Sequence, residues 1–94
     1  MASPLHPDLS EVVDVRTGLI RARGRLTEQG ADLLRGTADS LRGTGHTRVV
    51  LDLSGVREAD SAGLDILDRL ESSFRADGDV LLITHPPAAV SISA

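Results

Sequence analysis

The chain has 94 residues, of which 40% are hydrophobic, and its formal net charge at pH 7 is −4. One small domain with an aliphatic core fits this length, since the chain has one Phe, no Trp and no Tyr, and the absence of Cys excludes disulfides and thiolate metal sites. The acidic balance without a basic stripe argues against direct nucleic-acid binding, and the lack of a signal peptide or of a run of about 20 apolar residues predicts a cytoplasmic protein without membrane insertion.

The first part of the chain predicts a β-hairpin. Residues 1–10 carry two prolines and no periodicity, so we expect a flexible lead-in before the domain. Residues 11–15 alternate weakly, as an edge strand does, and residues 19–24 alternate apolar and basic side chains, as a half-exposed strand does. The Thr17-Gly18 pair between them is typical of a tight turn, so the two strands are expected to pair antiparallel.

A helix is predicted to follow the hairpin. Thr27 is the expected N-cap, because its hydroxyl can accept from a backbone N–H of the first turn, and Glu28 suits the positive end of the helix. Gly43 or Gly45 is expected to end the helix. Four residues mark its predicted buried face: Leu33, Leu34, Ala38 and Leu41.

The centre of the chain, residues 48–70, predicts a strand, a loop and a second helix. Residues 49–53 are almost continuously apolar, which is typical of a buried strand, and the one polar residue among them, Asp52, is expected to be satisfied by backbone N–H groups of the loop. The loop delivers Asp60 and Ser61 to the start of the helix. The predicted buried face of this helix carries Leu64, Leu67, Leu70 and Phe74, with Ile66 beside it.

A further strand is predicted near the C-terminus. Asp77-Gly78 favours a turn, and residues 79–84 are apolar enough for another buried strand. Strands that alternate with helices in this way are expected to run parallel and to be joined by crossovers. We therefore expect an α/β fold in which helices pack against a mixed β-sheet. Residues 85–94 leave two alternatives open, a helix that starts at Pro87 or a short strand.

Ser61 has two interpretations at the start of the second helix. It is either an ordinary N-cap, since Ser oxygens accept from unpaired backbone N–H groups, or an exposed hydroxyl that receives a phosphoryl group. The second interpretation is physically reasonable because the N–H groups and the dipole at a helix start stabilise a phosphate anion. Local sequence alone favours the cap.

Three stretches of the chain carry motifs in a particular order. They are GLIRARGRLT, then RVVLDLSGV followed by ADSAGL, then DVLLITHPP. In residue type and order they resemble the STAS domain family, of the anti-sigma factor antagonist type, over residues 12–89. The resemblance implies a STAS-like mixed sheet within residues 11–94. Because the family continues past the Pro turn through a further helix and strand, it also implies a C-terminally shortened domain with an exposed sheet edge, which suits a homodimer.

The resemblance also implies a function. The family's Asp-Ser-Ser/Ala-Gly run places its phosphorylated Ser at Ser61, and the implied partner is an anti-sigma factor serine kinase. The unphosphorylated antagonist binds this kinase and releases the sigma factor, and phosphorylation ends the binding. No catalytic activity, cofactor or metal is implied for the chain itself. The predicted partner-binding residues are Arg25, Thr27, Glu58, Asp60, Ser61, Ala62 and Gly63.

The neighbours of Ser61 each have a second interpretation. Asp60 either contacts the kinase or serves as a helix cap. Gly63 either gives the partner close access to the helix start or permits tight packing between helix and strand. Arg25 and Thr27 either contact the kinase or only serve the start of the preceding helix.

Two other functions compete with the antagonist. Residues 59–63 resemble a G-x-S-x-G nucleophile elbow with its first Gly replaced, but such an elbow follows its strand directly, and the predicted loop separates Leu53 from Ser61. Nothing in the sequence places a His against that Ser, which argues against a hydrolase; the three are His6, His46 and His85. The stronger rival is a non-phosphorylated STAS subunit of a transporter or sensor complex.

Overall fold

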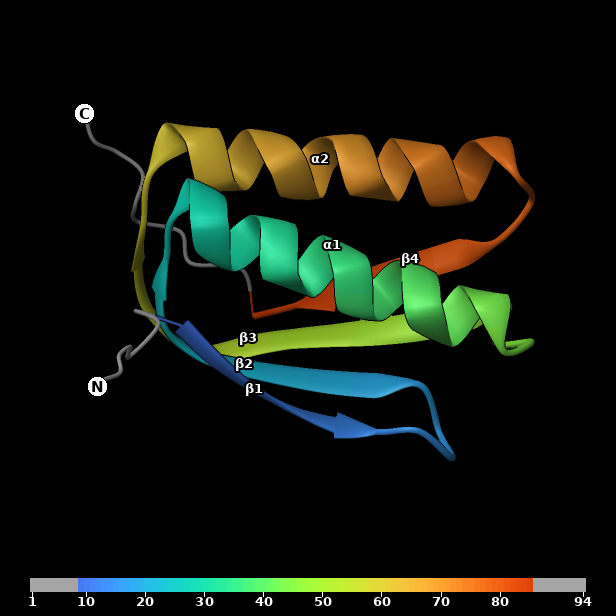
Figure 1. The fold of residues 1–94 in the computed structure, drawn as a ribbon. Helices are drawn as coiled ribbons and strands as arrows, with labels where there is room; N and C mark the ends of the chain where they lie inside the picture. Colours follow the sequence, from blue (N-terminus) through green and yellow to red (C-terminus); the bar gives the residue numbers. More distant parts are fainter. Residues whose placement is uncertain (1–8, 86–94) are drawn as a thin grey trace, which may run out of the picture.

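The computed structural model describes residues 9–85. In chain order the elements are β1 (Leu9–Asp14), β2 (Leu19–Leu26), α1 (Glu28–Gly43), β3 (Arg48–Ala59), α2 (Ser61–Ala76) and β4 (Val80–Thr84). The strands form one sheet in the order β1-β2-β3-β4, with β1 antiparallel to β2 and the other neighbours parallel. Both helices lie on one face of this sheet (Figure 1). The predicted α/β fold, with helices packed against a mixed sheet, is confirmed.

The predicted hairpin forms, but its first strand starts earlier than expected. β1 begins at Leu9, inside the predicted lead-in of residues 1–10, and Leu9 is buried, at 1% exposure. Leu9 packs against the start of α1, where a Cβ added to Gly30 would lie 3.0 Å from Leu9 Cβ. The turn at Thr17-Gly18 is confirmed, and Gly18 has a φ of +76°, which glycine adopts without steric cost.

α1 has the predicted N-cap, but its buried face differs from the prediction, since it includes Gly30 and Ala31 and leaves out Leu33. Thr27 Oγ1 accepts a hydrogen bond from Gly30 N at 3.1 Å, and the helix ends at Gly43. Leu33 was predicted to be buried, and this is wrong, because Leu33 is 43% exposed. It lies beside the open edge of β1 instead of over the sheet. The buried residues of α1 are Gly30, Ala31, Leu34, Ala38 and Leu41.

β3 is longer than predicted, because its pairing with β2 continues past Leu53. The predicted loop between Leu53 and the second helix is wrong, since the strand runs to Ala59, which pairs with Leu26. The register shifts twice along this pair of strands. Near the first shift, a Cβ added to Gly55 would lie only 2.8 Å from Arg23 Cβ, so glycine permits the close approach of the two strands.

Asp52 lies on the sheet face opposite the helices and is held by its neighbours. Ser54 N donates to Asp52 Oδ1 at 2.9 Å, which confirms that a backbone N–H satisfies this carboxylate, although the N–H belongs to the strand. His85 Nδ1 lies 3.3 Å from Asp52 Oδ1, and Arg21 Nε lies 3.9 Å from Oδ2. The hydrogen bonds from Ser54, the backbone one first, lower the pKa of Asp52, and His85 adds to this effect.

α2 has the predicted buried face, whereas β4 is less buried than predicted. Leu67, Leu70 and Phe74 are buried, and Leu64 and Ile66 are partly buried against the core. In the sheet that residues 9–85 form, β4 is an edge strand and the helices cover only one of its faces, so Val80 and Leu82 are 50% and 42% exposed. Apart from His85, the two alternatives for residues 85–94 lie outside the described residues.

The core fills the space between the sheet and the two helices, and it is almost entirely aliphatic. Its largest fully buried side chains are Phe74, Leu9, Ile20, Leu26, Leu34, Leu51, Leu53 and Val49. The Arg42 guanidinium lies over the Phe74 ring, 4.3 Å from its centroid, and so links α1 to α2. Within residues 9–85, neither helix is long and apolar enough to cross a membrane.

Candidate functional site

The two strand–helix junctions of the fold lie next to each other. β2 leads into α1 at Thr27, β3 leads into α2 at Asp60, and the last residues of the two parallel strands, Leu26 and Ala59, are register partners. Asp60 N donates to Leu26 O at 3.0 Å and ties the junctions together. Both helices therefore start at the same end of the domain (Figure 1). In α/β folds, binding sites form at this carboxyl end of the strands.

Asp60, not Ser61, caps α2. Asp60 has an extended backbone, with φ −97° and ψ 169°, and its Oδ1 accepts from Gly63 N at 2.7 Å. The alternative in which Ser61 is the N-cap is therefore wrong. Ser61 is the first residue of α2 and is exposed, as is Ala62 after it. Thr27 plays the same capping role for α1 that Asp60 plays for α2.

Gly63 allows α2 to start against the neighbouring junction. A Cβ at this position would lie 2.7 Å from Leu26 O and 3.0 Å from Thr27 O, both of which are backbone atoms. Gly63 is buried in this contact. Of its two predicted roles, the structure accounts for tight helix–strand packing, and access for a partner stays a prediction.

The structure brings most of the predicted site residues together. Arg25, Thr27, Glu58 and Asp60 line a small hollow of about 80 Å³ between the two junctions. Arg25 Nε lies 3.7 Å from Glu58 Oε1, and both side chains are more than half exposed, so this ion pair contributes little to stability. Sequence reasoning missed the carbonyl of Leu26, because any residue type supplies that acceptor and no pattern identifies it.

Charges at this end of the domain are mainly negative. Glu28, in the first turn of α1, joins Glu58 and Asp60, whereas Arg25 pairs with Glu58 and Arg57 precedes Glu58 on β3. The partial positive charge at each helix start compensates part of this negative charge. A further anionic group on Ser61 would be tolerated by the helix start, but it would make the surrounding surface more acidic.

The separation between Leu53 and Ser61 no longer argues against a hydrolase, because β3 runs up to Ala59. The contacts of the two described histidines bear on a hydrolase more directly, because each contacts a residue other than Ser61. His46 Nε2 lies 2.6 Å from Val15 O, and His85 Nδ1 contacts Asp52. Ser61 itself has the backbone of an ordinary helical residue instead of a strained elbow. His6 lies outside the described residues.

Comparison with protein families identifies the fold. The family described as "Mlab, STAS domain" matches residues 8–92, which is most of the chain. The chain belongs to the STAS family. This STAS domain also superposes on a solved structure entitled "Crystal Structure Analysis of Mglu", with a TM-score of 0.65 and 22% sequence identity. At this identity the likeness shows the fold alone.

The superposition covers 77% of this STAS domain and 18% of the chain of that structure. No curated protein sequence is a significant match to the STAS domain described here. Membership of the family confirms the predicted resemblance to STAS domains. It gives the domain a general role in STAS-type binding, with which an anti-sigma antagonist is compatible.

Proposed function

We propose that this STAS domain is an anti-sigma factor antagonist whose binding is switched off by phosphorylation of Ser61. In this proposal the unphosphorylated protein binds an anti-sigma factor serine kinase and so releases a sigma factor. The observation that carries it is that capping and exposure fall on different residues at the start of α2. Asp60 supplies the cap, so the exposed Ser61 hydroxyl is free to be modified without loss of that cap.

The proposed switch is a local change in charge. The kinase transfers the γ-phosphoryl group of ATP to Ser61 Oγ, the hydroxyl proton is lost, and ADP leaves. The phosphoserine then adds a charge of about −1.5 to −2 at neutral pH. Because Glu58 and Asp60 already make this surface acidic, a kinase surface that fits the unphosphorylated site meets like-charge repulsion.

The predicted partner-binding residues divide into two groups in this proposal. The side chains of Arg25 and Glu58 are more than half exposed and, together with Ser61 and Ala62, offer direct contacts to the kinase. Thr27, Asp60 and Gly63 act mainly by positioning, since the first two cap helices and the third packs against Leu26. Substituting the first group should change binding more than stability.

The experiment compares serine variants of this protein in binding to the anti-sigma factor kinase that the proposal requires. Ser61→Ala should keep binding and abolish phosphorylation, because the capping hydrogen bond of Asp60 is unaffected. Ser61→Asp should weaken binding at least about tenfold, because it places charge in the interface. Ser72→Asp, at an exposed position further along α2, is the matched control and should bind like the parent. If Ser61→Asp binds as tightly as the parent, the electrostatic switch is wrong.

A second candidate is a non-phosphorylated STAS subunit of a transporter or sensor complex. The description of the matching family, "Mlab, STAS domain", is compatible with it, since it names a STAS domain without a specific role. Such a subunit would bind its partner constitutively and would not be phosphorylated on Ser61. Gene neighbourhood separates the two candidates: an adjacent anti-sigma kinase supports the antagonist, and an adjacent transporter subunit supports the alternative.

The proposal includes the setting in which the antagonist acts. It works in the cytoplasm, without a cofactor or catalytic activity of its own, and without contacting nucleic acid. Its β4 edge pairs with a second copy, because this strand has no charged residue and exposes Val80 and Leu82. Leu82→Lys should then lower the sedimentation coefficient at high concentration, whereas Val12→Lys on β1 should not. A parent protein that stays monomeric at high concentration refutes the dimer.

A further inference from the structure

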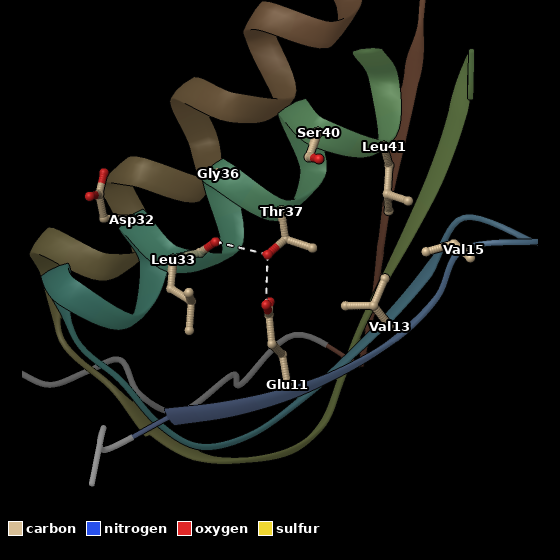
Figure 2. Close-up of a pocket in the computed structure, with 9 residues that line it drawn as sticks. All are labelled: Glu11, Val13, Val15, Asp32, Leu33, Gly36, Thr37, Ser40 and Leu41. Carbon is tan, nitrogen blue, oxygen red and sulfur yellow. Dashed lines mark hydrogen bonds between the residues drawn. The ribbon is translucent and has the colours of Figure 1, made fainter. Parts of the chain in front are cut away.

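An open groove runs between β1 and α1, away from the Ser61 junction. Its volume is about 500 Å³. Val13 and Val15 line it from the hairpin side, and Leu33 and Leu41 line it from α1, as Figure 2 shows. None of the residues that form this groove belongs to the hollow beside Ser61. The groove is therefore a separate feature, and its inference does not depend on the proposed function.

The walls of the groove carry apolar side chains that the rest of residues 9–85 leaves exposed. Leu33 is 43% exposed although it continues the apolar pattern of α1, and Val15 is 67% exposed. Gly36 also lines the groove, and a Cβ added there would meet no other part of the structure within 4 Å. These exposed apolar side chains are available for contact with another molecule.

A carboxylate with an unused acceptor lies in the groove. Glu11 Oε2 accepts from the Thr37 hydroxyl at 2.6 Å, and this hydrogen bond spans from β1 to α1 (Figure 2). The other oxygen, Oε1, is buried and has no hydrogen-bond partner among the described residues. A buried carboxylate oxygen without a donor is costly, and a cationic donor is the group that relieves this cost best.

The groove also borders a free strand edge. Among the described residues β1 pairs with β2 alone, so its other edge has backbone groups available for a further strand. Glu11 and Val13 are two residues apart on the strand and both line the groove. A strand added beside β1 would place alternate side chains on that same face, one opposite Glu11 and one opposite Val13.

We propose that the groove binds an extended segment of a partner protein that carries an arginine flanked, two residues away, by apolar side chains. The backbone of the segment pairs with β1, the Glu11 side chain turns so that Oε1 can accept from its guanidinium, and its apolar side chains cover Val13 and Leu33. Strand addition of this kind takes its affinity from backbone hydrogen bonds and its specificity from alternate side chains. No basic residue lines the groove, so the arginine meets no competing charge there.

The test uses a blocked Val-Thr-Arg-Thr-Val peptide, whose symmetry suits either strand direction. Its control is the same peptide with the neutral analogue citrulline in place of arginine. Binding is followed by the amide chemical shifts of the ¹⁵N-labelled full chain. Saturable shifts should appear along β1 and α1, and the arginine peptide should bind about tenfold tighter than the citrulline peptide, as one charge-assisted hydrogen bond implies.

Two variants separate this role from a structural one. Glu11→Gln keeps an acceptor for the Thr37 hydroxyl, so the fold is retained, but the preference for arginine over citrulline should fall to about one, since the charge is gone. Asp68→Asn removes an exposed carboxylate on α2, outside the groove, and should leave the preference unchanged.

Three results would overturn the proposal. The first is no saturable shift at about 5 mM peptide, a concentration that would reveal even a millimolar complex. The second is equal binding of the two peptides by the parent, or shifts centred on β4 instead of β1. The third is the same pattern of shifts on concentrating the protein without peptide, which would assign the groove to a second copy of this chain.

Discussion

Gly63→Ala should destabilise the protein, although alanine is normally the better residue in a helix. The added Cβ would lie 2.7 Å from Leu26 O, 3.0 Å from Thr27 O and 3.2 Å from Leu26 C. All three are backbone atoms of the β2–α1 junction, and they cannot move without disturbing the cap of α1. The start of α2 would have to shift away from β2. This shift would weaken the hydrogen bond from Asp60 N to Leu26 O.

The size of the effect follows from two opposing terms. Overpacking at such a contact costs about 1–3 kcal/mol, and replacing Gly by Ala in a helix gains up to about 1 kcal/mol. The net loss is about 1–2 kcal/mol, which corresponds to a fall of about 1–2 M in the urea midpoint for a small domain with an m-value near 1 kcal/mol/M. Urea unfolding followed by far-UV circular dichroism measures this directly.

Gly36→Ala is the matched control, because it is the same substitution in the other helix. No atom lies within 4 Å of its added Cβ, so only the gain in helix propensity remains, and the urea midpoint should rise. The two variants are thus expected to shift in opposite directions. If Gly63→Ala unfolds at the parent's midpoint or above it, the close contact between the two junctions does not limit the fold and this reasoning is refuted.

Two further predictions concern aspartates. Asp60→Ala should lower the stability by about 0.5–2 kcal/mol in the same urea assay, because it removes the oxygen that accepts from Gly63 N, and an unchanged midpoint would show that the cap contributes nothing. The pKa of Asp52 is lowered in the folded protein, so its stabilising contribution is present above the unfolded-state pKa and is lost as the pH falls through the folded-state pKa. Asp52→Asn should therefore destabilise the protein at pH 7 and have little effect in strong acid, and an equal effect at both pH values would contradict this.

The order of the elements was predictable from the sequence, because local patterns specify it. The apolar run before Leu53, the helical spacing of Leu67, Leu70 and Phe74, and the turn at Gly18 each depend on residues close together in the chain. These features also carried the resemblance to the STAS family. The match to the STAS family model confirms this resemblance.

The structural features that were not predicted from the sequence depend on contacts between distant segments of the chain. β3 extends to Ala59 because β2 is available as a pairing partner, although Gly55 and the charged residues after it look like a loop. Asp60 and Ser61 are both good cap residues, and only the position of Leu26 O fixes which of them caps α2. Leu33 has the spacing of a core residue, yet α1 overhangs the edge of the sheet there.

The most direct test of the central claim is the phosphorylation state of this protein isolated from its native cells, measured by intact-mass and peptide mass spectrometry. The proposal predicts a phosphoryl group on Ser61, not on Ser72 or Ser73 of the same helix, which is absent from the Ser61→Ala variant. A protein that carries no phosphoryl group during growth and under stress would contradict the switch. Ser61 would then be an unmodified surface residue of a constitutive STAS binding subunit.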